Sequence, residues 1–115
     1  MQVQERQIQI YEQANGKCPF EEWIESLKDK KAKAIVFQRI DRVRLGNFGD
    51  CRSLGRGLYE LKISWGPGLR GYYGLEGLQI VVLLCGGDKA SQAKDIRIAH
   101  QLWGEFQKND AKKLR

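Results

Sequence analysis

The fold of this chain is decided by the stretch Ile80-Val81-Val82-Leu83-Leu84-Cys85-Gly86-Gly87-Asp88-Lys89, in which a wholly apolar run ends at two glycines. The apolar run predicts a strand that is covered on both faces. The residues from about 89 to 108 have the spacing of an amphipathic helix. A strand that ends in glycines and opens a helix leaves unpaired backbone N–H groups at one place. With Lys89 beside them, these groups predict a site for an anion.

The composition fits one compact domain over residues 1–115, with a tail that frays from about residue 108. Of the 115 residues, 42% are hydrophobic and 30% are charged, which suits a single core and leaves no room for a second domain. The net charge of +6 favours an anionic partner. Nucleic acid is the commonest such partner of a small basic domain.

The three cysteines, Cys18, Cys51 and Cys85, lie far apart in the sequence. They lack the close spacing of a metal site or of a disulfide framework, so we expect no metal, no cofactor and a reducing compartment. The N-terminal residues contain no apolar signal core, and the longest apolar run is too short to cross a bilayer. The sequence therefore predicts a cytoplasmic protein.

The rest of the chain predicts the order strand, helix, helix, strand, strand, strand, helix. A strand is expected from residue 3 to 11, and a short helix begins at Pro19. Asp29 caps a second helix that ends at Gly46. Alternation over residues 58–65, a turn at 66–68, and apolar runs at 69–73 and 79–85 then predict a three-stranded meander. The segments 46–50 and 55–57 have the composition of turns.

Six short motifs follow one another along the chain from Tyr11 to about Phe106. They are Pro19-Phe20-Glu21-Glu22-Trp23, Arg42-Val43-Arg44-Leu45-Gly46-Asn47-Phe48-Gly49-Asp50, Glu60-Leu61-Lys62-Ile63, Gly66-Pro67-Gly68-Leu69-Arg70, Leu83-Leu84-Cys85-Gly86-Gly87-Asp88-Lys89 and Asp95-Ile96. In this order the motifs resemble those of the RelE/HigB-like toxins of bacterial toxin–antitoxin modules, in the branch of addiction module killer proteins and phage Gp49-like proteins.

The resemblance implies a small α+β fold of the RelE type, with a twisted, mainly antiparallel four-stranded sheet. It also implies a type II toxin that acts as an mRNA interferase, an endoribonuclease that cleaves messenger RNA at the ribosome. Such a toxin is neutralised by a cognate antitoxin, which by analogy carries a helix-turn-helix DNA-binding domain. An acidic or amphipathic antitoxin segment would cover the basic face of the toxin or displace its last helix.

The chemistry of RNA cleavage points to Lys62 and Arg70. Metal-independent cleavage uses the ribose 2′-hydroxyl as the nucleophile, so the protein has to stabilise negative charge on the phosphorane and assist the departing 5′-oxygen. A guanidinium suits this charge because it binds two phosphate oxygens at once. In the resemblance, Arg70 matches the arginine that contacts the scissile phosphate, Lys62 matches a basic residue of the preceding strand, and Lys89 falls near a basic residue after the last strand. The alternative is a solvated strand face in which these cations pair with Glu60.

Glu60 departs from the best-known ribosome-dependent members of that family, which have a lysine at this position. Glu60 is therefore either a general base held ionised by the cations or a residue that only orients Lys62. Tyr72, Arg56 and Lys94 are predicted to contact RNA. Tyr72 is expected on the same strand face as Arg70, where it would stack on a base or simply pack, with Tyr73 turned toward the core.

The sequence leaves three functions open. The first is the ribonuclease toxin described above. The second is a toxin of the same fold that poisons DNA gyrase and has no nuclease activity. The third is a non-catalytic RNA-binding relic, in which Glu60 marks lost activity.

Overall fold

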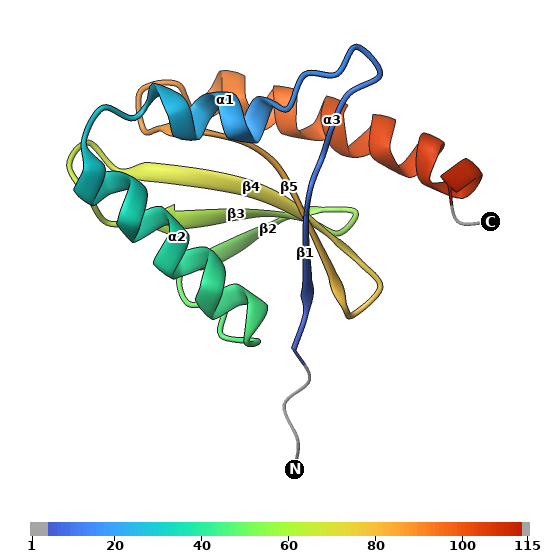
Figure 1. Cartoon of the computed structure of the whole chain (residues 1–115), viewed down its shortest axis with the longest axis horizontal. Helices are drawn as coiled ribbons and strands as arrows, with labels where there is room; N and C mark the ends of the chain where they lie inside the picture. The colour runs from blue at the N-terminus through green and yellow to red at the C-terminus, as the bar shows by residue number, and fades with distance from the viewer. Residues whose placement is uncertain (1–4, 114–115) are drawn as a thin grey trace.

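The computed structural model describes residues 5–113, which form one sheet and three helices (Figure 1). Helix α1 begins at Pro19, as the sequence predicts, and the carboxylate of Asp29 caps α2 by accepting from the Lys31 N–H at 2.8 Å. Strands β3 to β5 form the expected meander. The elements are β1 Gln7–Ile10, α1 Pro19–Ser26, α2 Lys30–Arg44, β2 Cys51–Gly55, β3 Leu58–Ile63, β4 Leu69–Glu76, β5 Ile80–Asp88 and α3 Gln92–Lys113.

The predicted four-stranded, mainly antiparallel RelE-type sheet is wrong. The sheet has five strands in the order β1-β5-β4-β3-β2, and β1 pairs with β5 in parallel, so the sheet is mixed. The additional strand is β2, which pairs with β3 across a two-residue turn. Residues 5–113 form a small α+β domain with three helices.

Two features explain the error. Strand β2 contains Arg52, Ser53 and Gly55, which show no apolar alternation and lie at the edge of the sheet. The direction of β1 is set by long-range pairing: helices α1 and α2 return the chain to the same end of the sheet, so β1 runs parallel to β5. Of the strand expected from residue 3, residues 3 and 4 lie outside the described part of the chain.

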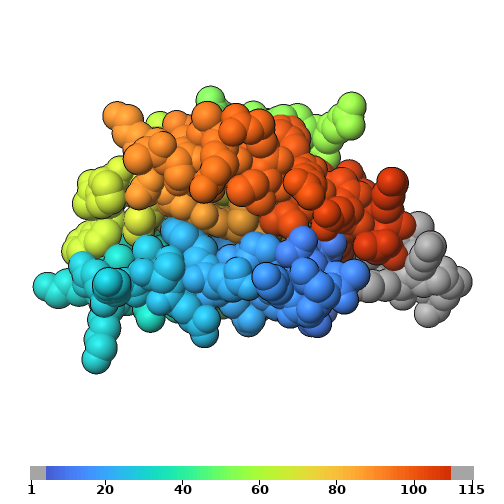
Figure 2. Space-filling view, turned by 90° about the horizontal axis from the view of Figure 1, so that it is seen from above, coloured from blue at the N-terminus to red at the C-terminus, as the bar shows by residue number. Residues whose placement is uncertain are grey.

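Helices cover both faces of the sheet, so there are two cores. Helices α1 and α2 pack on one face, and α3 packs on the other. In the space-filling view, α3 and the segment that contains α1 form two layers (Figure 2). Buried on the first face are Phe20, Val36, Val43, Leu61, Ile63, Tyr73, Val81 and Leu83; on the second face they are Leu58, Tyr72, Val82, Leu84, Ala99, Leu102 and Trp103. Strand β5 is covered on both sides, as its composition predicts.

The two ends of α3 differ from the expectation. The helix begins at Gln92 rather than near Lys89, because Gly86 to Asp88 continue β5. At the other end it continues to Lys113, beyond the predicted end near Lys108. In the described residues, no helix is both long and apolar enough to cross a membrane.

Candidate functional site

Polar side chains on the α3 face of the sheet are aligned across three strands. In the first row, Arg52, Glu60 and Tyr72 are direct partners on β2, β3 and β4. In the next row, Lys62 on β3 is the direct partner of Arg70 on β4. Because alternate residues of a strand point to the same face, the two rows share one face and are separated by about 7 Å, two residues of strand. This grid brings an acidic residue and several basic residues together.

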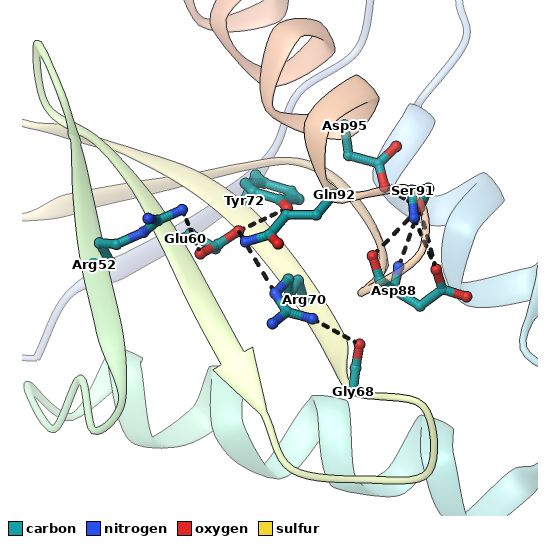
Figure 3. Close-up of polar contacts among 9 residues, drawn as sticks. All are labelled: Arg52, Glu60, Gly68, Arg70, Tyr72, Asp88, Ser91, Gln92 and Asp95. Atoms are coloured by element: carbon teal, nitrogen blue, oxygen red, sulfur yellow. Dashed lines mark hydrogen bonds and ion pairs between the residues drawn. The ribbon is translucent and has the colours of Figure 1, made fainter.

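Glu60 lies at the centre of this grid and is fully buried, with 0% of its surface exposed. Its Oε2 atom accepts hydrogen bonds from the Tyr72 hydroxyl and from the side-chain amide of Gln92, each at 2.9 Å. Its Oε1 atom lies 3.1 Å from a guanidinium nitrogen of Arg52, and Oε2 lies 3.7 Å from Nε of Arg70 (Figure 3). We call these five residues the Glu60 cluster. A carboxylate can stay charged in such a place because donors and cations surround it.

The burial of Glu60 shows that its position on β3 is not on a solvated strand face. Helix α3 covers that part of the strand and contributes Gln92 to the cluster. Both oxygens of Glu60 point at protein groups, so the carboxylate is not placed to take a proton from a ligand in solution. Among the described residues, the ion pairs of Glu60 are with Arg52 and Arg70, so it orients Arg70 rather than Lys62.

Arg70 is held at the edge of the cluster with 8% of its surface exposed. Its Nη1 donates to the carbonyl oxygen of Gly68 at 3.2 Å, which turns the guanidinium toward the start of β4 (Figure 3). Its partner Lys62 is exposed to solvent. The pair therefore combines a fixed guanidinium with a mobile ammonium group on one surface.

Lys89 joins this pair from the end of β5. Leu69 on β4 is the partner of Asp88, so Lys89 follows the strand next to Gly68. A Cβ atom at Gly68 would lie 3.3 Å from Nη1 of Arg70 and 3.8 Å from Cβ of Lys89. Gly68 thus lies between the guanidinium of Arg70 and the first carbon of the Lys89 side chain. We call Lys62, Arg70 and Lys89 the basic patch.

The three residues predicted to contact RNA lie elsewhere. Tyr72 is fully buried below α3, as its 0% exposure shows, so its ring offers no face to a base. Burial, together with the bond to Glu60, raises the pKa of its hydroxyl above the ordinary value of 10.0. Arg56 lies in the β2–β3 turn, and about 13 Å of strand separates the start of β3 from Lys62. Lys94 is exposed on the first turn of α3.

The expected anion site after β5 is filled by the protein itself. Gly87 lies within β5, and a Cβ atom there would come within 1.8 Å of a carboxylate oxygen of Asp95. Asp95 is buried and accepts from the hydroxyl of Ser91. Ser91 in turn donates its N–H to the carboxylate of Asp88 at 3.2 Å (Figure 3). These side chains and the glycine fix the start of α3 on the sheet.

Sequence reasoning missed Arg52 and Gln92. Arg52 belongs to β2, a strand that the apolar pattern did not reveal, and Gln92 reaches Glu60 from 32 residues away. The signal for both is Glu60 itself, because an acidic residue in an otherwise apolar central strand needs partners. Among the described residues, no group of three or more His, Cys, Asp or Glu side chains is placed to hold a metal ion.

Comparison with known proteins identifies a relative of this chain. No family model matches the chain. A protein of Haemophilus influenzae, described as an uncharacterized protein, is 46% identical over 87 residues, which cover 76% of this chain and 88% of the relative. At this identity and coverage the two chains share the same fold and ancestry, so this chain belongs to the family of the Haemophilus influenzae protein.

Proposed function

We propose that this protein is the toxin of a type II toxin–antitoxin system, related to the RelE/HigB-like toxins, and that it cleaves messenger RNA at the ribosome without a metal ion. The observation that carries the proposal is the direct pairing of Lys62 with Arg70, with Lys89 beside Arg70 across Gly68. Three cations on one surface suit the negative charge that develops on a phosphate during cleavage. The sequence motifs of the resemblance support the same function.

In the proposed reaction, the ribose 2′-oxygen attacks the adjacent phosphorus and the bond from phosphorus to the 5′-oxygen breaks. The products are a 2′,3′-cyclic phosphate and a free 5′-hydroxyl. Arg70, fixed by Glu60 and the Gly68 carbonyl, stabilises the phosphorane. The exposed ammonium of Lys62 gives a proton to the 5′-oxygen, and Lys89 binds a phosphate oxygen. The proton of the 2′-hydroxyl passes to solvent, because Glu60 is enclosed.

The burial of Glu60 also favours a second candidate, an RNA-binding protein that does not cleave. In this case the basic patch holds the RNA backbone and no accessible carboxylate takes part in chemistry. The two candidates make the same prediction for RNA binding and opposite predictions for RNA cleavage.

A toxin of this kind works in the cytoplasm and has an antitoxin, which we propose is a helix-turn-helix DNA-binding protein with an acidic or amphipathic segment. The basic patch is the surface that such a segment complements. A short reading frame for a DNA-binding protein beside the gene is the expected source of this partner.

The test is induced expression in bacteria, followed by measurement of growth and mapping of RNA ends. We expect the wild-type protein to arrest growth and to produce new RNA ends with codon periodicity. Lys62→Ala and Arg70→Ala abolish both effects. Lys28→Ala, which removes an exposed lysine from the α1–α2 connection on the other side of the sheet, keeps both effects.

Circular dichroism and thermal unfolding of each purified variant show whether it folds. A folded Lys62→Ala or Arg70→Ala protein that still cleaves RNA contradicts the proposed roles. Growth arrest with intact transcripts and a DNA-damage response contradicts the nuclease and indicates gyrase poisoning. RNA binding through the basic patch without any new ends supports the non-catalytic candidate.

A further inference from the structure

A shallow pocket lies at the tip of the β3–β4 hairpin, directly beyond the basic patch. It has a volume of about 550 Å³, and its lining consists of the hairpin residues 64–68 together with Lys89. The fold does not need this pocket for its core, and the catalytic roles proposed above do not use Trp65 or Pro67.

The pocket lies just past the paired ends of β3 and β4. Ser64 follows Lys62 by two residues and Gly68 precedes Arg70 by two residues, and each lies one position outside its strand. Two residues of extended chain span about 7 Å, which sets the distance from the pair Lys62 and Arg70 to the pocket. This spacing is on the scale of one nucleotide, so a chain whose phosphate lies on Arg70 would bring a neighbouring base to the pocket.

Trp65 gives the pocket an aromatic wall that is held in place. Its side chain is half-buried. It packs against the core between the sheet and helices α1 and α2, and it also lines the pocket. The turn that carries it is closed by a hydrogen bond from the Gly68 N–H to the Trp65 carbonyl at 2.9 Å. A fixed aromatic ring next to cations is the arrangement that binds single-stranded nucleic acid by base stacking.

We infer that this pocket is a subsite for one unpaired RNA base, which stacks on Trp65 while Lys89 and Arg70 hold the adjoining phosphate. The inference rests on the proposed function and extends it, because it names the position that selects the nucleotide next to the cleaved bond. Stacking tolerates every base, so the subsite requires a single-stranded substrate and gives a preference rather than an absolute sequence requirement.

The test measures binding separately from cleavage. The probe is a short single-stranded 2′-O-methyl RNA, which has no free 2′-hydroxyl and cannot be cut by the proposed reaction. Binding of this RNA is expected to quench the tryptophan fluorescence of the wild-type protein. Quenching is expected to be lost in Trp65→Phe, because Trp103 is buried and Trp23 packs against Gly86 and does not line the pocket. Anisotropy of a labelled probe gives the affinity, which we expect to fall roughly 5- to 150-fold in Trp65→Ala and less in Trp65→Phe.

Leu78→Ala is the matched control. Leu78 is a large exposed apolar residue in the β4–β5 turn, at the opposite end of β4, and its loss should leave the affinity unchanged. If Trp65→Phe and Trp65→Ala bind the probe as tightly as the wild-type protein, or if Leu78→Ala weakens binding equally, the subsite is refuted. If Trp65→Ala does not fold, the fluorescence and affinity of Trp65→Phe decide.

The proposed function has a separate readout. If the Trp65 variants still cut RNA at unchanged positions while Lys62→Ala does not, the subsite fails and the nuclease stands. If the wild-type protein binds the probe with Trp65 quenching but generates no RNA ends in cells, the nuclease fails and the subsite stands. If Trp65→Ala keeps its RNA affinity but loses binding of the antitoxin, the pocket is a protein-binding surface and the inference is overturned.

Discussion

Replacing Glu60 by alanine tests whether this buried carboxylate holds the site together. In the Glu60→Ala protein, the hydroxyl of Tyr72 and the guanidinium of Arg70 stay buried, the first without an acceptor and the second without its anion. Arg52 has 55% of its side chain exposed and can turn to water, so its loss of a partner costs little.

The expected cost follows from these contacts. Removing one partner of a buried ion pair destabilises a protein by about 3–5 kcal/mol. The unsatisfied Tyr72 hydroxyl alone accounts for about 1–3 kcal/mol, which is included in that total. Glu60→Gln keeps an oxygen for the two donors and loses only the charge, so we expect a cost of about 1–2 kcal/mol.

Urea unfolding followed by circular dichroism measures these free energies, because a domain of this size usually unfolds in a two-state transition. Glu25→Ala, at an exposed position of α1, is the control and should change stability by less than about 0.5 kcal/mol. The double variant Glu60→Met/Arg70→Met should be more stable than Glu60→Met alone, because the second substitution removes a buried guanidinium that has lost its carboxylate. A Glu60→Ala protein that loses less than about 1 kcal/mol would show that Glu60 does not hold Arg70 and Tyr72 in place.

Two further predictions concern the cores. Burial raises the pKa of Tyr72 and Tyr73 above 10.0, so the folded protein keeps both phenols protonated where the unfolded chain ionises them. Their contribution to stability is complete below pH 10 and is lost as the pH rises above it; urea unfolding at several pH values should show this decline, and Tyr73→Phe should reduce it. In Gly74→Ala, the new Cβ atom would lie 2.3 Å from the ring of Trp103. We therefore expect the free energy of unfolding, measured with urea, to fall by about 1–3 kcal/mol. An unchanged free energy of unfolding would contradict the close packing of Trp103 on Gly74.

Local signals were sufficient for several elements. The proline and the acidic first turn of α1, the Asp29 cap of α2 and the alternation of β3 depend on neighbouring residues, and each is found where the sequence places it. Strand β2 and the parallel pairing of β1 depend on contacts between distant segments. A single sequence contains no local record of such pairing, so the sheet was predicted with one strand too few.

The same division applies to the candidate site. The pairing of Lys62 with Arg70 follows from a hairpin whose turn is marked by glycines and proline, so it was accessible from the sequence. The burial of Glu60 was not, because it depends on where α3 crosses the sheet and on Gln92 at the start of that helix. From the sequence, Gly86 and Gly87 were assigned to an anion site. In the structure the carboxylate of Asp95 lies over Gly87, and this contact depends on where α3 packs on the sheet.

The chemical groups at the cut RNA ends show whether the protein cleaves RNA through the ribose 2′-hydroxyl. RNA from cells that express the wild-type protein, or from a translating extract to which it is added, is examined for the groups at the new ends. We expect 2′,3′-cyclic phosphate and 5′-hydroxyl ends, present with the wild-type protein and absent with Arg70→Ala. Ends with a 3′-hydroxyl and a 5′-phosphate, or cyclic phosphate ends that persist in a folded Arg70→Ala protein, would contradict this expectation.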